Sequence, residues 1–331
     1  MNDHDVIRAL RAQVGVDFDA RFSGDACITL SLYDDRNPFG GLIRHHSHAE
    51  KQNILTLVAR LENLEYLNLR KNKLGELPHC LGGLQRLRHL NLGSCLLRQT
   101  PDFVFGNIAL ETLFLGSNLI ETLDARLFSL ENLKSLHLHK LMLRGFPDGL
   151  SRLHSLETMH LYLSGLKEFP PELFECRKLS ALSFGFSPLR TLPDVIGNLH
   201  KMKYFTLVVT KVKTLPDSFC NLNELVATRL YKNRIEHLPD DIGNLRNLEQ
   251  ITLYQNRLRA LPESFSRLTQ LRKLNLSKNN FAVLPDAVHA LPALEWLAFF
   301  DNPGGSKIQR LTQPHTVLER PFGGMDTPSG L

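Results

Sequence analysis

The sequence predicts an α/β repeat solenoid, because one pattern recurs every 23 residues along most of the chain. Apolar residues at the fourth and sixth positions of each unit alternate with polar residues, which predicts one short strand per unit with one buried face. Stacked units would share a continuous core that no single unit could form alone. Eleven repeat starts follow one another without insertion or deletion: Leu64, Leu87, Leu110, Leu133, Leu156, Leu179, Met202, Leu225, Leu248, Leu271 and Leu294.

The repeat follows the pattern L-x-x-L-x-L-x-x-N-x-L-x-x-L-P, which is clear from Leu248 to Pro262. This pattern resembles the leucine-rich repeat family. Segments such as L-P-D-V-I-G-N-L at 192–199 and L-P-D-D-I-G-N-L at 238–245 are similar to its 23-residue intracellular Ras-group and bacterial branch. The resemblance implies a curved horseshoe with a parallel concave sheet and short helices or 3-10 turns on the convex side. It names no ligand.

The repeats divide the chain into three predicted regions. Residues 1–63 form an N-terminal cap, residues 64–303 form the repeat domain with ten 23-residue units plus a partial eleventh, and residues 304–331 form a flexible C-terminal tail. A solenoid needs a cap because its first repeat would otherwise expose the leucine core. Gly and Pro residues after Asn302 end the repeat pattern and favour a mobile tail.

The cap is expected to contain a helix, a strand and a capping helix. Residues 4–13 place apolar side chains on one helical face, and Ile28, Leu30 and Leu32 alternate as in a strand. Ser47 and Glu50 have the spacing of a capping box. The helix that follows them is expected to bury one stripe of side chains: Ile54, Leu57, Val58 and Leu61.

Two columns of the repeat predict local structure. Proline occupies the fifteenth position in nine of ten units, and the carboxylate that often follows it would favour the N-terminus of a convex helix or turn; an acidic binding stripe is the alternative. The ninth position is mostly Asn, which can hydrogen-bond buried backbone groups of adjacent turns. Leu141 cannot do so and begins a four-unit stretch without Asn. This stretch reflects either repeat drift or an altered curvature near a ligand.

Composition and motifs favour a non-enzymatic cytoplasmic protein. The formal net charge is +5, and 34 acidic residues are interspersed with 39 basic residues, which does not favour nucleic acid as the partner. Five cysteines have no disulfide-framework spacing, and no apolar run is long enough to span a membrane. No phosphate-binding loop, nucleophile elbow or C-x-x-C pair occurs, so no enzyme activity, cofactor or metal is predicted. Secretion into a host cell by a non-classical route is the alternative location.

The concave side is the predicted partner-binding surface. Because strand side chains alternate, the third, fifth, seventh, eighth and tenth residues of each unit should point outward from the sheet. These positions carry an apolar and aromatic centre flanked by basic ends. The candidate partner-binding residues are Arg70, Phe114, His137, His139, His160, Tyr162, Phe186, Val208, Arg229, Tyr231, Lys232, Arg234, Tyr254 and Arg257.

These residues favour a protein-interaction module or scaffold in intracellular signalling, because exposed aromatic and Arg side chains are enriched in protein interfaces. The basic flanks predict an acidic partner surface. A secreted bacterial effector or an adaptor associated with a ubiquitin ligase is the first alternative. RNA or metal binding through the concave Tyr, His and Arg residues is the second. Trp296 and Phe300 lie at outward positions of the last strand, where a homodimer contact is a further alternative.

Overall fold

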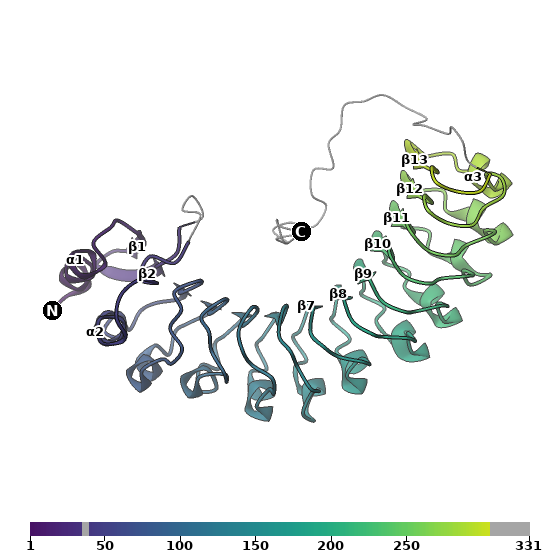
Figure 1. Ribbon diagram of the computed structural model, residues 1–331. Coiled ribbons are helices and arrows are strands. Elements are labelled where there is room, and N and C mark those ends of the chain that lie inside the picture. Colours follow the sequence, from purple (N-terminus) through teal and green to yellow (C-terminus); the bar gives the residue numbers. More distant parts are fainter. Residues whose placement is uncertain (35–39, 305–331) are drawn as a thin grey trace. The chain divides into compact units, whose positions relative to one another are not determined.

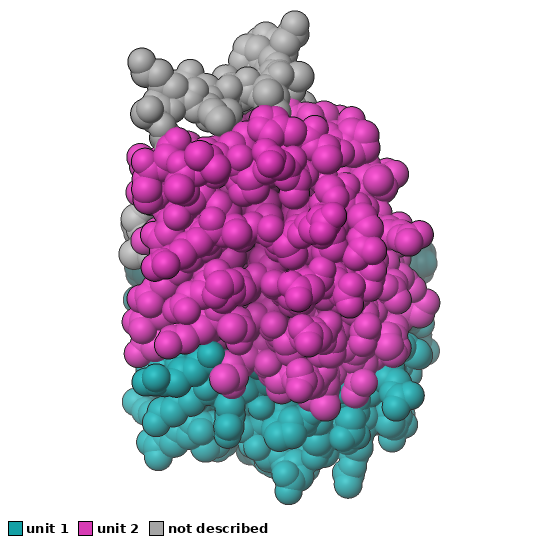
Figure 2. Space-filling view, turned by 90° about the vertical axis from the view of Figure 1, so that its right-hand side faces the viewer, with its two compact units in different colours: residues 1–190 teal, residues 191–331 magenta. Residues whose placement is uncertain are grey.

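The computed structural model describes residues 1–34 and 40–304. The chain forms two compact units, unit 1 at Met1–Arg190 and unit 2 at Thr191–Leu331, which Figure 2 colours separately. The predicted flexible tail lies outside the described residues, except for Gly304.

The N-terminal part of unit 1 contains a helix, a hairpin and a second helix. Helix α1 (Asp3–Val14) buries Val6, Ile7 and Leu10, as its sequence pattern predicts. Strands β1 (Asp19–Ser23) and β2 (Ala26–Ser31) pair antiparallel. Only β2 was predicted. Strand β1 was missed because its side chains are exposed or half-buried, so it lacks an apolar face.

Helix α2 (His48–Val58) begins at the predicted capping box. The Ser47 hydroxyl accepts a hydrogen bond from Glu50 N, and the Glu50 carboxylate accepts one from Ser47 N. Both bonds satisfy amide groups that a helix N-terminus leaves free. Ile54, Val58 and Leu61 are buried as expected, but Leu55 is buried where Leu57 was predicted.

The hairpin joins the repeats through a parallel sheet. Strand β2 pairs in parallel with β3, so the hairpin supplies the first parallel strand of the sheet in unit 1. Each repeat then adds one strand in chain order. These strands are β3 (Tyr66–Asn68), β4 (His89–Asn91), β5 (Thr112–Phe114), β6 (Ser135–His137), β7 (Thr158–Tyr162) and β8 (Ala181–Gly185).

Unit 2 continues the same organisation within its own repeats. Its strands are β9 (Tyr204–Val208), β10 (Ala227–Arg229), β11 (Gln250–Thr252), β12 (Lys273–Asn275) and β13 (Trp296–Ala298). Neighbouring strands from β9 to β13 pair in parallel, with partners 23 residues apart such as Ile251 and Leu274. The predicted parallel sheet with one short strand per repeat is therefore confirmed.

Short helical segments lie on the opposite side of each unit from its strands (Figure 1). In unit 1 they are the 3-10 segments η1 (His79–Gly83), η2 (Asp102–Val104), η3 (Ala125–Ser129), η4 (Leu150–Arg152) and η5 (Pro171–Glu175). In unit 2 they are η6 (Asp194–Asn198), η7 (Asp217–Asn221), η8 (Ile242–Asn244), η9 (Glu263–Arg267) and helix α3 (Asp286–His289). Several begin with the predicted carboxylate directly after proline, as at Asp194 and Glu263. This supports the structural interpretation of those carboxylates.

The eighth position of every repeat has a left-handed backbone. Its φ angles run from 52° at Phe186 to 60° at Lys71. This conformation is uncommon for residues other than glycine, and it is strained for bulky or β-branched side chains. No glycine occupies the position in any repeat, so residue type gave no sign of it. The eleven residues are Lys71, Ser94, Ser117, Lys140, Leu163, Phe186, Val209, Lys232, Gln255, Lys278 and Asp301.

Candidate functional site: the strand faces

The strand face is defined here as the side chains at the third, fifth, seventh, eighth and tenth positions of the repeats. In unit 1 its centre is a stack of rings from three hydrogen-bonded strands. Phe114 and His137 are register partners on β5 and β6, and their ring centroids lie 3.8 Å apart at an interplanar angle of 16°. His160, the partner of His137 on β7, lies 4.6 Å from it. The parallel register thus brings residues 23 positions apart into one continuous stack.

A second row of rings lies beside this stack, at the seventh and eighth positions. His139 covers Gly116 so closely that a β-carbon on the glycine would lie 2.5 Å from the imidazole. Tyr162 and Phe186 meet edge to face, with centroids 6.5 Å apart. Glycine at 116 is therefore part of the surface, because only a missing side chain leaves room for the His139 ring.

Burial keeps two of the histidines neutral. Desolvation, followed by repulsion from His160 and His139, lowers the pKa of His137 to about 2. Desolvation, followed by repulsion from His139, lowers the pKa of His160 to about 4. The Ser135 hydroxyl lies 2.8 Å from His137 Nε2 and is its hydrogen-bond partner. At neutral pH both imidazoles are therefore uncharged, and the ring stack is an aromatic surface rather than a cationic one.

The histidines do not form a metal centre. Within residues 1–34 and 40–304, no group of three or more His, Cys, Asp or Glu side chains is arranged to hold a metal ion. The rings of His137 and His160 pack against each other at an interplanar angle of 37°. The metal alternative is therefore not carried further.

The strand face of unit 2 is cationic. Lys278 Nζ lies 5.5 Å from the centroid of the Tyr254 ring and 4.0 Å from Asp301. Arg257 lies 3.7 Å from Glu236, whereas Lys232 and Arg234 make no ion pair with any described residue. Asp301 is the one carboxylate at these positions among the described residues of unit 2. The cations are Lys211, Arg229, Lys232, Arg234, Arg257, Lys273 and Lys278.

Thirteen of the fourteen candidate residues have accessible surface or lie in the ring stack. Lys232, Arg234 and Arg257 are exposed. His160 is almost fully buried beneath its neighbours. The half-buried residues are Arg70, Phe114, His137, His139, Tyr162, Phe186, Arg229, Tyr231 and Tyr254.

The predicted exposure was wrong for Val208, which is fully buried. A valine side chain extends only a short distance from the sheet. Tyr231, at the same position of the next repeat, has a longer side chain and is half-buried. The alternation of a strand sets the direction of a side chain but not its exposure, which depends on the length of its neighbours.

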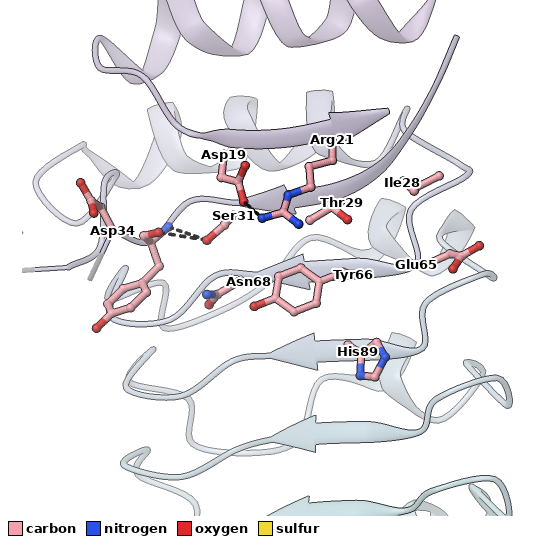
Figure 3. Close-up of a pocket in the computed structure, with 11 residues that line it drawn as sticks. Asp19, Arg21, Ile28, Thr29, Ser31, Asp34, Glu65, Tyr66, Asn68 and His89 are labelled. Atoms are coloured by element: carbon pink, nitrogen blue, oxygen red, sulfur yellow. Dashed lines mark hydrogen bonds and ion pairs between the residues drawn. The ribbon is translucent and has the colours of Figure 1, made fainter. Parts of the chain in front are cut away.

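Sequence reasoning missed a pocket of about 720 Å³ beside the hairpin of unit 1. Figure 3 shows Asp19 and Arg21 on β1 facing Tyr66 and His89 on β3 and β4. Asp19 and Arg21 form an ion pair at 3.6 Å. The pocket was missed because the sequence pattern of β1 did not predict a strand.

Comparison with known proteins fits this architecture. A family model for the leucine-rich repeat matches residues 56–97 and 225–281. The chain is a leucine-rich repeat protein. Its fold supports protein interaction in general. The comparison with curated proteins finds no significant match.

Solved structures show the same fold in bacterial and plant proteins. A leucine-rich repeat protein of Leptospira interrogans is 29% identical with a TM-score of 0.64, and the match covers 75% of this chain and 69% of that one. InlJ from Listeria monocytogenes is 20% identical (TM-score 0.61, covering 74% and 50%). The plant peptide hormone receptor RGFR1, in complex with RGF2, is 23% identical (TM-score 0.56, covering 73% and 48%). The chain spans about half the length of the last two.

The described residues contain no helix that is long and apolar enough to cross a membrane.

Proposed function

We propose that this protein is a non-enzymatic interaction module whose strand face binds an acidic segment of a protein partner. The charge distribution of unit 2 carries the proposal. Its strand face has seven cations and one carboxylate, Asp301, although the whole chain has nearly equal numbers of basic and acidic residues, 39 and 34. Such a one-sided surface attracts the opposite charge and speeds encounter with an acidic partner.

Tyrosine side chains supply the apolar contact area on this face. Tyr231 and Tyr254 occupy the seventh position of successive repeats, directly after strands β10 and β11, which pair in parallel. Both are half-buried, so each exposes part of its ring beside the cations. Tyrosine contributes large contact area at small entropic cost, and it is enriched among residues that dominate binding energy. The neutral ring stack of unit 1 offers a second surface of the same kind.

The cysteines support a reducing, cytoplasmic location and a role as an intracellular signalling scaffold. All five are free thiols. Burial raises the pKa of Cys95 and Cys176 to about 12, so they stay protonated and unreactive. Free buried thiols are typical of proteins that work where disulfides do not form. A secreted effector or an adaptor for a ubiquitin ligase would use the same binding face.

The test measures binding to partners captured from lysate by the full chain. The variant Lys232→Glu/Arg234→Glu reverses two unpaired cations of the strand face. Lys203→Glu/Arg246→Glu changes the net charge equally at exposed residues outside it. We expect the first variant to slow association at least tenfold at low salt, with a smaller difference at high salt, and the control to bind normally.

Two outcomes would overturn the proposal. Equal loss of binding in both variants would show that only total charge matters. Binding that disappears on nuclease treatment would show that the cations and tyrosines hold RNA instead.

Tyr231→Ala should weaken binding by about 2 kcal/mol without lowering the unfolding midpoint, since its ring is not part of the leucine core.

A further inference from the structure

The tenth position of the repeats in unit 1 carries a row of exposed apolar side chains that the repeat pattern does not explain. Leu96, Leu119 and Met142 occupy the tenth position of three successive repeats and are 43%, 48% and 71% exposed. In the other repeats the tenth position holds Lys, Arg, Asn, Gly or Pro. Single exposed apolar residues are common, but an aligned row of three is a surface with a defined geometry.

Leu96 has no structural reason to be leucine. Its φ is 63°, a left-handed conformation that costs a non-glycine residue stability. Gly165 holds the same repeat position with φ 76°. Glycine is the residue that this backbone conformation favours. Leucine here therefore strains the backbone and gains little burial. Lys73 takes the same conformation at this position with φ 50°, so exposure rather than backbone conformation points to a role: an apolar leucine here presents its surface for contact.

The spacing of the row fits a helix. Backbone hydrogen bonds join the three turns, from Leu119 N to Leu97 O at 2.7 Å and from Arg144 N to Glu121 O at 3.0 Å. Neighbouring turns in such a stack lie about 4.8 Å apart, so the row is about 10 Å long. Residues i, i+4 and i+7 of an α-helix span about 10.5 Å. Same-face residues of an extended strand are about 6.7 Å apart and would lose register over three contacts.

The charges around the row indicate which side chains should flank the apolar stripe of that helix. Lys73, Arg98 and Lys140 are exposed beside it, and none forms an ion pair with a described residue. The nearby carboxylate Glu121 is already paired with Arg144. Along the chain, Ser94 and Ser117 stand two positions before Leu96 and Leu119, and Arg98 and Glu121 stand two positions after them, so polar residues flank the row. Such a seam matches the apolar stripe of a helix better than the broad plane of a bilayer.

We infer that Leu96, Leu119 and Met142 form a docking seam for an amphipathic helix of a partner protein, with apolar residues at i, i+4 and i+7 and acidic residues beside them. The three seam residues share the strand face of unit 1 with the ring stack, but none of them is part of the stack. The adaptable methionine and two leucines would fill the spaces between helical side chains. Lys73, Arg98 and Lys140 would pair with the acidic flanks.

The probe is a synthetic acidic peptide of about 18 residues, or five helical turns, with Leu at i, i+4, i+7 and i+11 and Glu at most other positions. Fluorescence anisotropy measures its binding to the full chain. We expect saturable binding. A peptide of the same composition with Leu at alternate positions, and a peptide with Lys in place of Glu, should each bind at least about tenfold more weakly.

The matched variants replace equally exposed apolar residues at different places. Leu96→Gln/Leu119→Gln/Met142→Gln should weaken binding at least about tenfold. Ile108→Gln/Val195→Gln/Val283→Gln alters residues that are 68%, 47% and 71% exposed, and it should leave binding unchanged. Leu96→Gly should raise the unfolding midpoint and weaken peptide binding, because it relieves the left-handed strain and removes a contact. A residue with a merely structural role would not show this opposite pair of changes.

Three results would overturn the inference. The first is absence of saturable binding by the acidic helical peptide. The second is equal binding of the acidic, basic and alternating peptides. The third is binding to phosphatidylserine vesicles that the triple Gln variant abolishes while no peptide binds, which would assign the seam to a membrane surface.

Discussion

In unit 2, the ninth position of four successive repeats holds Asn233, Asn256, Asn279 and Asn302, which are buried and cross-link the repeats. In unit 1, three consecutive repeats hold Leu141, Ser164 and Ser187 at the same position. The Asn256 amide donates to Leu230 O at 2.8 Å and Leu253 O at 3.0 Å, and its oxygen accepts from Ile235 N at 3.0 Å. The Ser164 hydroxyl is buried without a hydrogen-bond partner among the described residues.

The strands are longer where serine replaces the asparagine, whereas β6, which precedes Leu141, keeps three residues. Strands β7 and β8, which precede Ser164 and Ser187, have five residues each and pair from Thr158 to Tyr162. Strands β10, β11, β12 and β13, which precede asparagine, have three. The short serine side chain leaves the end of the strand free to continue its ladder, while asparagine takes carbonyl groups of the turn. The two regions thus satisfy the same kind of backbone groups by different donors.

The largest expected difference between the regions is the cost of losing an asparagine. Asn256→Ala would leave two carbonyl groups and one amide without their buried partner, and each unsatisfied group costs about 1 to 3 kcal/mol. Because local relaxation recovers part of this, we expect a loss of about 3 kcal/mol in unfolding free energy. Urea denaturation at constant m-value measures it. A loss below about 1 kcal/mol would mean that the ladder contributes little to stability.

Low pH should destabilise unit 1 through the two histidines of its ring stack. His137 and His160 lie on β6 and β7, and both have a lowered pKa, so their stabilising contribution is present above the unfolded-state pKa and is lost as pH falls below it. As the pH falls, His137 and His160 bind protons in the unfolded chain but stay neutral in the folded chain. We expect about 1 kcal/mol less stability at pH 6 than at pH 7, from a pKa near 6.5 in the unfolded chain.

The control for this pH effect is His137→Phe/His160→Phe, which keeps the stacked rings and removes both imidazoles. Its urea midpoint should change less between pH 7 and pH 6 than that of the parent chain. An unchanged pH dependence in this variant would assign the acid sensitivity to other groups.

The sequence predicted the repeating part of the fold well because the period is regular. The leucine columns specify buried strands, and the proline and carboxylate pair specifies the 3-10 segments on the other side. Strand β1, the left-handed eighth position and the burial of Val208 were not predictable in this way. Each depends on contacts between residues far apart in the chain, and none has a distinctive residue type. The sequence placed Phe114, His137 and His160 at one repeat position, so it predicted that they share a face. It did not predict that burial keeps the two histidines neutral.

Backbone strain gives a smaller contrast within the stretch that lacks asparagine. Val209 is β-branched and has φ 54°, whereas Lys232 at the same position of the next repeat is unbranched with φ 55°. Asparagine tolerates this conformation, so Val209→Asn should raise the unfolding free energy by about 0.5 to 1 kcal/mol. Lys232→Asn, the matched change, should gain less. A decrease for Val209→Asn would show that burial of its half-exposed side chain outweighs the strain.

The smallest effect is expected at the serine that the comparison began with. Ser164 is fully buried and its hydroxyl makes no hydrogen bond with a described residue, so Ser164→Ala removes an unpaired polar group. Removing such a group is neutral or stabilising, and we expect a change of less than about 0.5 kcal/mol. Thr228→Val, which removes one of the two buried hydroxyls that lack a partner among the described residues of unit 2, keeps the volume nearly constant and should behave alike. A loss above about 1 kcal/mol for Ser164→Ala would show that serine replaces the asparagine through its side chain rather than through the longer strands.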